Sequence, residues 1–293
     1  MNKRHFPYWP KRLSKTLTIP ETTIVDHLET TAKRYPQKTA IHYYGASYSY
    51  KQLWEQVNAL AGYLQQKLSV QPGDRVLLYM QNSPQFIISY YAILRAEAIV
   101  VPINPMNTSE ELSFYVKDCE TKVGIVGQEL FAKAEPLLSA TPLEHIIVAA
   151  YSDYISESSP IALPDEVALP RQTYGHEHVY YWTDCLEANL SPNPYQGHVD
   201  DIAVLPYTSG TTGVPKGCIH PHRTVNANIV SAYHWGNVTS DSVCLVTLPL
   251  FHVTGMVHSM HLPIFAGSAM VMMTRWNRDS AARLIELYGC SHW

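Results

Sequence analysis

The sequence has few cysteines, no excess of positive charge and no long apolar run. Five cysteines are scattered among 293 residues, and no two of them form a Cys-x-x-Cys pair. An odd, scattered set predicts free thiols in a reducing compartment and argues against a disulfide framework. The 21 lysines and arginines are outnumbered by 25 aspartates and glutamates, which gives a net charge of −4. That balance disfavours a dedicated nucleic-acid binder.

Membrane-spanning and secreted proteins are disfavoured as well. The longest apolar region, residues 86–103, is interrupted by Arg95, Glu97 and Pro102, so it does not suit a lipid-spanning helix. The basic N-terminus continues into Ser, Thr and Pro instead of the apolar stretch of a signal peptide. We therefore expect a soluble, cytoplasmic protein without a transmembrane segment. With 46% hydrophobic residues, the chain has the material for a large core.

Hydrophobic patterning predicts the α/β class. Strand, helix, strand, helix and strand are expected in that order over residues 75–80, 86–94, 98–103, 110–119 and 123–126. Such alternation is typical of parallel strands joined by helical crossovers. Ser83 and Pro84 provide a cap and a first helical residue for the first of these helices.

A change of composition divides the chain. Residues 150–194 contain five prolines among Ser, Asp, Glu and Tyr, which predicts a loop-rich connection. A second unit is expected to begin near Asp200, with a strand at 203–207 and a helix at 225–233. We therefore predict a first α/β subdomain over about residues 20–195 and the start of a second over about residues 196–293.

The most informative segment lies between that strand and that helix. Residues 207–217 read Tyr-Thr-Ser-Gly-Thr-Thr-Gly-Val-Pro-Lys-Gly. Three glycines let the backbone approach a ligand and adopt positive φ, while four Ser and Thr hydroxyls and Lys216 add donors and a positive charge. Together these groups predict a polyphosphate site. The segment is not a Walker A loop, because the GxxxxGK[ST] spacing fails from both Gly210 and Gly213.

This segment resembles the phosphate-loop signature of the adenylate-forming (AMP-binding) superfamily, which includes acyl-CoA synthetases, peptide-synthetase adenylation domains and luciferases. Residues 91–105, YAILRAEAIVVPINP, resemble the family's helix, strand and Pro-Asx stretch. Residues 248–255, LPLFHVTG, resemble its aromatic-His segment beside the acyl pocket. The resemblance extends from about residue 22 to the last residue, and it is greatest to a long- or medium-chain fatty-acid CoA ligase.

The resemblance implies the N-terminal part of the acyl-CoA synthetase fold, with two α/β subdomains whose largely parallel sheets are flanked by helices. It also implies that ATP activates a carboxylic acid to an acyl-adenylate, and that coenzyme A then takes the acyl group with release of AMP. An ionised carboxylate is a poor electrophile, so it needs a better leaving group before a thiol can attack. ATP, Mg²⁺ and coenzyme A are the implied cofactor and co-substrates, and a homodimer is compatible with the resemblance.

The same resemblance assigns roles to individual residues. The expected nucleotide-binding residues are Thr208, Ser209, Gly210, Thr211, Thr212, Gly213, Lys216 and Gly217. The expected acid-binding residues are Phe251, His252, Thr254 and Gly255. Lys216 is expected to offset charge on the departing pyrophosphate, and Thr208 is the family position nearest Mg²⁺. Lys216 and His252 are thus the expected catalytic residues.

The acid is expected to be a plain carboxylic acid, and a fatty acid is favoured. Peptide-synthetase adenylation domains typically place an Asp in the stretch that matches residues 249–255, where it pairs with the substrate's ammonium group. Here no carboxylate follows until Asp279, so an amino-acid substrate would bury its charge without a partner. Apolar residues such as Val253 and Met256 suit an acyl chain, although core packing explains them equally well. An aryl or short-chain acid is the alternative.

Other interpretations stay open at this point. His252 is either a residue that orients the carboxylate or a core histidine that hydrogen-bonds a carbonyl group. The histidine sets 252/258/261 and 220/222 lack a Cys or carboxylate at ligand spacing, so a metal held by protein ligands alone is disfavoured.

The family's later motifs are not found in the sequence. They comprise a Tyr-Gly-x-Thr-Glu segment near adenine, an Asp for the ribose, and a C-terminal domain with a catalytic Lys. We therefore expect an N-terminal fragment that is catalytically inactive by itself. A non-catalytic nucleotide-binding module and a degenerate interaction protein are the alternatives from other functional classes.

Overall fold

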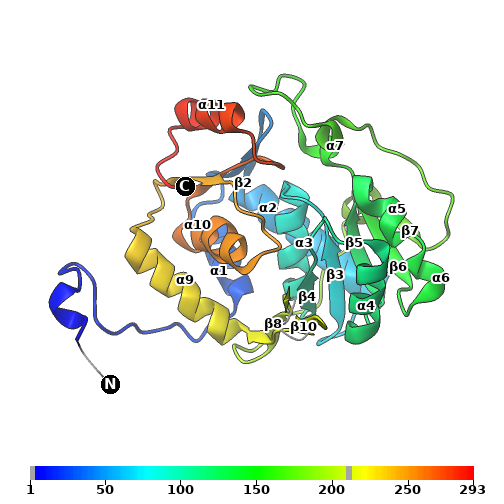
Figure 1. Cartoon of the computed structure of the whole chain (residues 1–293), viewed down its shortest axis with the longest axis horizontal. Coiled ribbons are helices and arrows are strands. Elements are labelled where there is room, and N and C mark those ends of the chain that lie inside the picture. The colour runs from blue at the N-terminus through cyan, green and yellow to red at the C-terminus, as the bar shows by residue number, and fades with distance from the viewer. Residues whose placement is uncertain (1–3, 209–212) are drawn as a thin grey trace.

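The structure is a computed structural model that describes residues 4–208 and 213–293 (Figure 1). Within these residues the strands form two larger sheets and a two-stranded ribbon. The seven-stranded sheet has the order β11 (His220–Pro221), β8 (Ile202–Val204), β4 (Ile99–Pro102), β3 (Arg75–Tyr79), β5 (Val123–Gly127), β6 (His145–Ala149) and β7 (Val179–Tyr181). The four-stranded sheet has the order β12 (Val243–Val246), β13 (Ala269–Met272), β1 (Thr39–Tyr43) and β2 (Ala46–Ser49).

The seven-stranded sheet is parallel from β8 to β7, and only β11 runs antiparallel at its edge. The crossovers from β3 to β4 and from β4 to β5 contain the helices α3 (Pro84–Arg95) and α4 (Ser109–Cys119). As predicted, Ser83 caps α3, because its hydroxyl accepts a hydrogen bond from the backbone N–H of Phe86. The predicted α/β class with parallel strands and helical crossovers is confirmed.

Helix α3 lies at the centre of the molecule (Figure 1). Every residue from 84 to 94 is buried, as expected of a helix that is apolar on all sides. It packs against α2 (Tyr50–Gln66) and α1 (Ile24–Arg34). The largest hydrophobic cluster joins these three helices to strands of both sheets, so the two sheets share one core.

The four-stranded sheet combines strands that are far apart in the sequence. β1 pairs in parallel with β13, with Ile41 opposite Met270, and β2 returns antiparallel to β1. Conversely, β8 and β11, which follow residue 200, belong to the seven-stranded sheet. Each sheet therefore draws strands from both of the predicted sequence ranges, and the boundary near residue 195 stays a prediction.

The segment predicted to be a loop-rich connection is only partly irregular. It contains β7 and three short helices, η3 (Tyr151–Tyr154), α7 (Asp165–Ala168) and α8 (Trp182–Glu187). Trp182 is buried, and its indole N–H donates to the hydroxyl of Tyr154 at 3.1 Å. This packing stabilises ordered structure despite the many prolines.

Short helices and the elements that follow residue 207 complete the fold. They are η1 (Phe6–Tyr8), η2 (Gln128–Leu130), α5 (Phe131–Ala134), α6 (Leu137–Ala140), η3 (Tyr151–Tyr154), β9 (Tyr207–Thr208), β10 (Lys216–Gly217), α9 (His222–Gly236), the π-helix η4 (Gly255–His261), α10 (Leu262–Ala266) and α11 (Arg278–Tyr288). All five cysteines lie in the described part of the chain and are free. A helix with the length and hydropathy needed to span a membrane is not found among the described residues.

Candidate functional site

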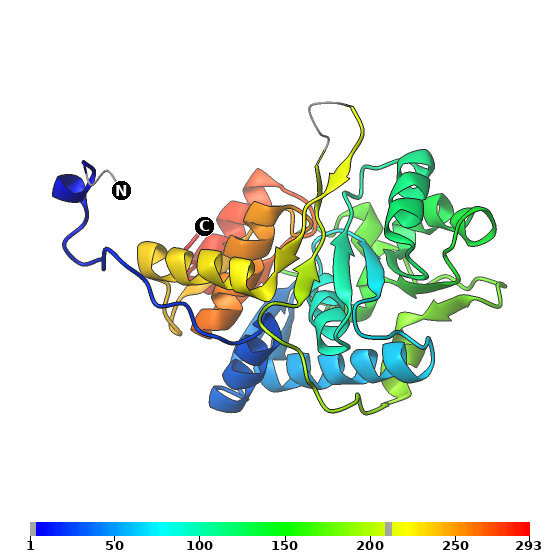
Figure 2. The same cartoon turned by 90° about the horizontal axis from the view of Figure 1, so that it is seen from below.

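The Thr- and Gly-rich segment forms a hairpin whose stem is β9 and β10. The two strands pair antiparallel, with Lys216 opposite Thr208 and Gly217 opposite Tyr207. Residues directly opposite each other in an antiparallel pair direct their side chains to the same face. The side chains of Thr208 and Lys216 therefore project from the same face of the hairpin, and both residues are exposed. Figure 2 shows the hairpin rising at the boundary between the two larger sheets with their helices.

Half of the predicted nucleotide-binding set can be placed. Thr208, Gly213, Lys216 and Gly217 are described, whereas Ser209, Gly210, Thr211 and Thr212 lie outside the described residues. Gly213 has a φ of 85°, a left-handed conformation that glycine adopts at little cost. The described stem thus carries Thr208 and Lys216 on opposite strands, with their side chains on one face.

Tyr207 anchors the stem of the hairpin, a role that the sequence did not reveal. Its hydroxyl donates to the carboxylate of Asp118 at 2.5 Å and lies 2.9 Å from Sγ of Cys119, at the end of α4. Its ring contacts the ring of Tyr115, with 4.6 Å between centroids. Burial and the Asp118 carboxylate raise the pKa of Tyr207, so the phenol stays protonated and remains a donor.

Gly217 lies close to the ring of Tyr207. A Cβ at this position would lie 3.3 Å from Cζ of that ring, so the ring would have to shift by a few tenths of an ångström. Without a side chain at residue 217, the ring lies across the strand without that shift. The ring of Tyr207 thus contacts Gly217 on the opposite strand and Tyr115 of α4.

The second predicted segment follows the carboxyl end of β12 and folds into a tight turn. The backbone N–H of His252 donates to the carbonyl of Pro249 at 3.1 Å, and that of Met256 donates to the carbonyl of His252 at 2.9 Å. The turn closes on Gly255, where a Cβ would lie only 2.1 Å from the carbonyl oxygen of Pro249. The segment therefore doubles back on itself before the π-helix begins.

The His252 side chain is exposed, so the alternative of a core histidine does not fit. Its Nδ1 accepts a hydrogen bond from the backbone N–H of Thr254 at 3.3 Å. In the neutral ring the proton therefore resides on Nε2. This leaves His252 with an outward-facing donor, while Phe251 is half-buried against the shared core.

The apolar residues after His252 divide between core and surface. Met256 and Met260 are buried, and the hydroxyl of Tyr90 donates to Sδ of Met256 at 3.2 Å. Val253 is 42% exposed. Core packing therefore accounts for the two methionines, whereas Val253 remains available to a ligand.

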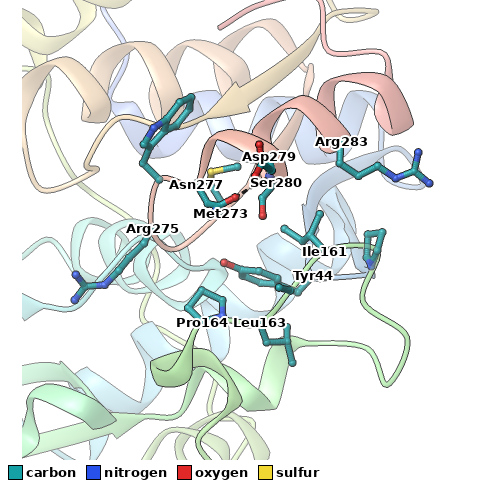
Figure 3. Close-up of a pocket in the computed structure, with 13 residues that line it drawn as sticks. Tyr44, Ile161, Leu163, Pro164, Met273, Arg275, Asn277, Asp279, Ser280 and Arg283 are labelled. Atoms are coloured by element: carbon teal, nitrogen blue, oxygen red, sulfur yellow. Dashed lines mark hydrogen bonds between the residues drawn. The ribbon is translucent and has the colours of Figure 1, made fainter.

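The described surface includes two clefts of similar volume. One, of about 590 Å³, is lined by residues of α9, β12 and the π-helix together with Leu248 and Trp293. Leu248 is its contact with the 248–255 segment, and Phe251, His252, Thr254 and Gly255 are not in its lining. The other, of about 610 Å³, lies at the carboxyl ends of β1 and β13. Figure 3 shows that the guanidinium groups of Arg275 and Arg283 point away from the middle of this second cleft. It contains none of the predicted site residues.

The histidine set 252/258/261, considered for metal binding, divides between the surface and the core. His252 and His258 are exposed, whereas His261 is buried and contacts the hydroxyl of Tyr91 through Nδ1 at 2.9 Å. Residues 4–208 and 213–293 contain no group of three or more His, Cys, Asp or Glu side chains arranged to hold a metal ion.

The Gly255→Ala substitution is expected to destabilise the protein by about 1–3 kcal/mol, because the added methyl group must displace the Pro249 backbone. Urea unfolding checks this value. Gly236→Ala is the matched control, since its Cβ would meet its nearest neighbour, Cγ2 of Val238, at an ordinary 3.5 Å. Equal stability losses in the two variants would contradict the assigned role of Gly255.

Sequence comparisons link the chain to known enzymes. A family described as "AMP-binding enzyme" matches residues 28–293. A long-chain-fatty-acid–CoA ligase of Bacillus subtilis (strain 168) is 30% identical over 287 residues, which cover 95% of this chain and 51% of the relative. A medium-chain fatty-acid–CoA ligase of Escherichia coli (strain K12) is 25% identical, with 92% of this chain and 45% of the relative covered. The chain spans about half the length of these curated relatives.

Solved structures share the fold. A long-chain-fatty-acid-CoA ligase from Archaeoglobus fulgidus superposes with a TM-score of 0.76 at 24% identity, covering 94% of this chain and 51% of that one. The anthranilate CoA ligase AuaEII, in complex with anthranoyl-AMP, superposes with a TM-score of 0.77 at 24% identity, covering 93% and 49%. The two-sheet arrangement described above is therefore that of the N-terminal half of known acyl-CoA ligases.

Proposed function

Because this chain belongs to the AMP-binding enzyme family, we propose that the protein takes part in ATP-dependent activation of a carboxylic acid and its transfer to coenzyme A. In the first step a carboxylate oxygen attacks the α-phosphorus of ATP, the bond to the bridging oxygen breaks, and pyrophosphate leaves. In the second step the thiol of coenzyme A attacks the acyl carbon and AMP leaves with the bonding electrons. The thiol proton passes to solvent or to a base.

The observation that carries this proposal is the cross-strand pair of Thr208 and Lys216. An exposed hydroxyl and an exposed ammonium on one face of a rigid stem suit the oxygens of a polyphosphate. Negative charge accumulates on pyrophosphate as its bond to the α-phosphorus breaks, and the Lys216 ammonium offsets that charge. Tyr207 anchors the stem through Asp118, and the stem pairing sets the backbone position of Lys216 before pyrophosphate leaves.

The described residues also suit Mg²⁺ bound together with a nucleotide. Mg²⁺ usually takes only one or two protein oxygens and completes its shell with phosphate oxygens and water. Thr208 supplies one such oxygen at the stem, and the ion would supply further charge neutralisation to the phosphates. The exposed Nε2–H of His252 is suited to hold a carboxylate oxygen of the acid.

A fatty acid is the proposed substrate class. The two relatives described above are named as fatty-acid CoA ligases, and the segment from residue 249 to residue 255 contains no carboxylate that would pair with an ammonium group. A cleft that includes Leu248, just before this segment, is lined largely by apolar and aromatic side chains. An aryl or short-chain acid remains the alternative substrate. A cytoplasmic location and a homodimer stay part of the proposal.

The test is acid-dependent exchange of labelled pyrophosphate into ATP, with the complete product of the gene and acids from acetate to palmitate, plus benzoate. We expect exchange with the longer aliphatic acids and none without acid. We expect no acid-dependent AMP formation by the 293-residue chain alone, because the Tyr-Gly-x-Thr-Glu motif is not in its sequence. Nucleotide binding without exchange for any acid would favour the non-catalytic module instead.

A further inference from the structure

One buried side chain connects the seven-stranded sheet to the His252 segment. Asn82 follows the end of β3 and is only 7% exposed. Its Nδ2 donates to the carbonyl of Leu248 at 2.9 Å, and its Oδ1 accepts from the backbone N–H of Leu250 at 2.8 Å. Both polar atoms of one amide are thus used by two backbone groups of one loop.

This pair of hydrogen bonds imitates the pairing of two peptide groups. One planar amide offers a donor and an acceptor with fixed separation, and it meets a carbonyl and an N–H that are two residues apart. The bond to Leu250 is buried, so its loss would leave the N–H of Leu250 without a partner, whereas the bond to the more exposed Leu248 is only partly buried. The backbone from residue 248 to residue 250 is therefore fixed in position, and Phe251 and His252 follow it directly.

Asn82 is itself held at a fixed place. The backbone N–H of Gln81 donates to the hydroxyl of Tyr151 at 2.8 Å, and that hydroxyl donates to the carboxylate of Glu129 at 2.9 Å. Ser83, on the other side, caps α3. We call the two hydrogen bonds of Asn82 to Leu248 and Leu250 the clamp. Through the neighbouring Gln81 it is connected to residues that follow the carboxyl ends of β3, β5 and β6 in the central sheet.

The turn of the His252 segment does not by itself set its place in the molecule. Its internal hydrogen bonds and the contact of Gly255 with Pro249 fix only the shape of the turn. The bonds to Asn82 join it to the sheet whose strand β8 leads into the hairpin. Leu250 and Phe251 also pack in the shared core, and the bonds to Asn82 add a polar connection to the sheet. Loss of that connection is expected to loosen the placement of Phe251 and His252 relative to Thr208 and Lys216.

We propose that Asn82 is a positioning residue, which holds the Phe251–His252 segment at the place where the acid's carboxylate must lie relative to the nucleotide hairpin. This inference rests on the proposed function. It predicts that loss of the clamp weakens use of the acid while leaving use of ATP nearly unchanged, because the hairpin stem is anchored separately by Tyr207.

The first test is backbone hydrogen exchange in the 293-residue chain. In Asn82→Ala we expect the amide of Leu250 to exchange about tenfold faster relative to global unfolding. Asn82→Asp keeps the acceptor, so it should retain protection at Leu250 even though the donor to Leu248 is lost. Asn58→Ala is the matched control, since Asn58 also bonds through both amide atoms, to Trp54 and Arg95, but does not contact the loop. Unchanged exchange in Asn82→Ala, or an equal change in Asn58→Ala, would overturn the clamp.

The second test uses pyrophosphate exchange by the complete gene product. We expect Asn82→Ala to raise the KM for the acid by about tenfold and the KM for ATP by less than about twofold. An equal rise for both substrates would overturn the positioning role and indicate general disruption. If the unaltered protein shows no exchange with any acid, the proposed function fails together with the acid-positioning role, whereas the hydrogen-exchange result still decides whether the clamp exists.

Discussion

Lys216→Ala is expected to slow adenylate formation by about 100- to 1000-fold, the usual loss when one preorganised donor to transition-state charge is removed. The ammonium lies opposite Thr208 on a stem that is anchored by Tyr207. The pairing of the stem therefore sets the backbone position of Lys216 before charge develops on pyrophosphate. The measurement is single-turnover acyl-adenylate formation by the complete gene product at saturating ATP and acid.

Two further variants distinguish loss of the positive charge at residue 216 from a general effect of replacing an exposed lysine. Lys216→Arg keeps the positive charge and should recover part of the rate, although its planar fork is larger than an ammonium group. Lys33→Ala is the control, because Lys33 is also an exposed lysine but lies on α1, where it pairs with Glu29. We expect wild-type rates from this control. A rate for Lys216→Ala within about twofold of wild type would refute the role assigned to Lys216.

Acidification from about pH 7 to about pH 4 is expected to remove most of the stability of the fold. Three histidines, His27 of α1, His222 of α9 and His261 of the π-helix, are buried in their neutral form. Burial lowers the pKa of His27 and of His222 to about 4, and that of His261 to about 3. The unfolded chain, with ordinary histidine pKa values near 6.5, takes up protons that the folded chain excludes.

The contacts of these histidines explain why protonation is costly. Nδ1 of His222 accepts from the backbone N–H of Ile24 at 3.1 Å, at the first turn of α1, and a proton there would remove the acceptor. Among the described residues, Nδ1 of His27 and Nε2 of His261 have no hydrogen-bond partner. A charged ring would therefore lie in the core with an unpaired polar atom, and for His27 the Asp26 carboxylate offsets only part of the cost of burial.

The expected magnitude follows from the size of the shifts. Each pKa unit corresponds to about 1.4 kcal/mol, so three histidines with shifts of two units or more give on the order of 8 kcal/mol. That value is comparable with the whole stability of many domains. Glu129 acts in the opposite direction: burial raises its pKa to about 7, so its contribution declines as the pH rises from about 4.5 to about 7. Because one carboxyl opposes three imidazoles, stability should still fall with acid.

Urea unfolding at several values between about pH 7.5 and about pH 4.5 measures this slope. His27→Leu should flatten the dependence, because it removes one of the three groups. His258→Gln is the control, since His258 is exposed, and it should leave the slope unchanged. Stability that does not vary over this range would contradict the buried neutral state of the three histidines.

Local patterns in the sequence were sufficient for much of the first sheet. The alternation of strands and helices between residues 75 and 126 predicted β3, α3, β4, α4 and β5 to within about two residues. Each of these predictions depends on hydrophobic periodicity and on caps such as Ser83, which act over one or two turns of chain. The segment from residue 207 to residue 217 was likewise sufficient to identify the family, because its glycines, hydroxyls and lysine are consecutive.

Local sequence patterns did not predict which strands share a sheet. The early hairpin of β1 and β2 joins β13, more than two hundred residues later, and that pairing places it in the second sheet. Period-two alternation shows only that a strand has a buried face. It does not show which neighbour will bury that face or supply the hydrogen bonds of the ladder.

The sequence by itself determined the α/β class, the parallel crossovers and the family, because these depend on residues that are close along the chain. Only the tertiary structure decided that Asn82 holds the loop before His252, that Tyr207 is anchored on Asp118, and that His261 is buried while His252 is exposed. The contacts of Asn82 and Tyr207 join groups that are far apart in the sequence and are brought together by the tertiary fold. Their energies depend on desolvation and on exact hydrogen-bond geometry, which a one-dimensional pattern does not contain.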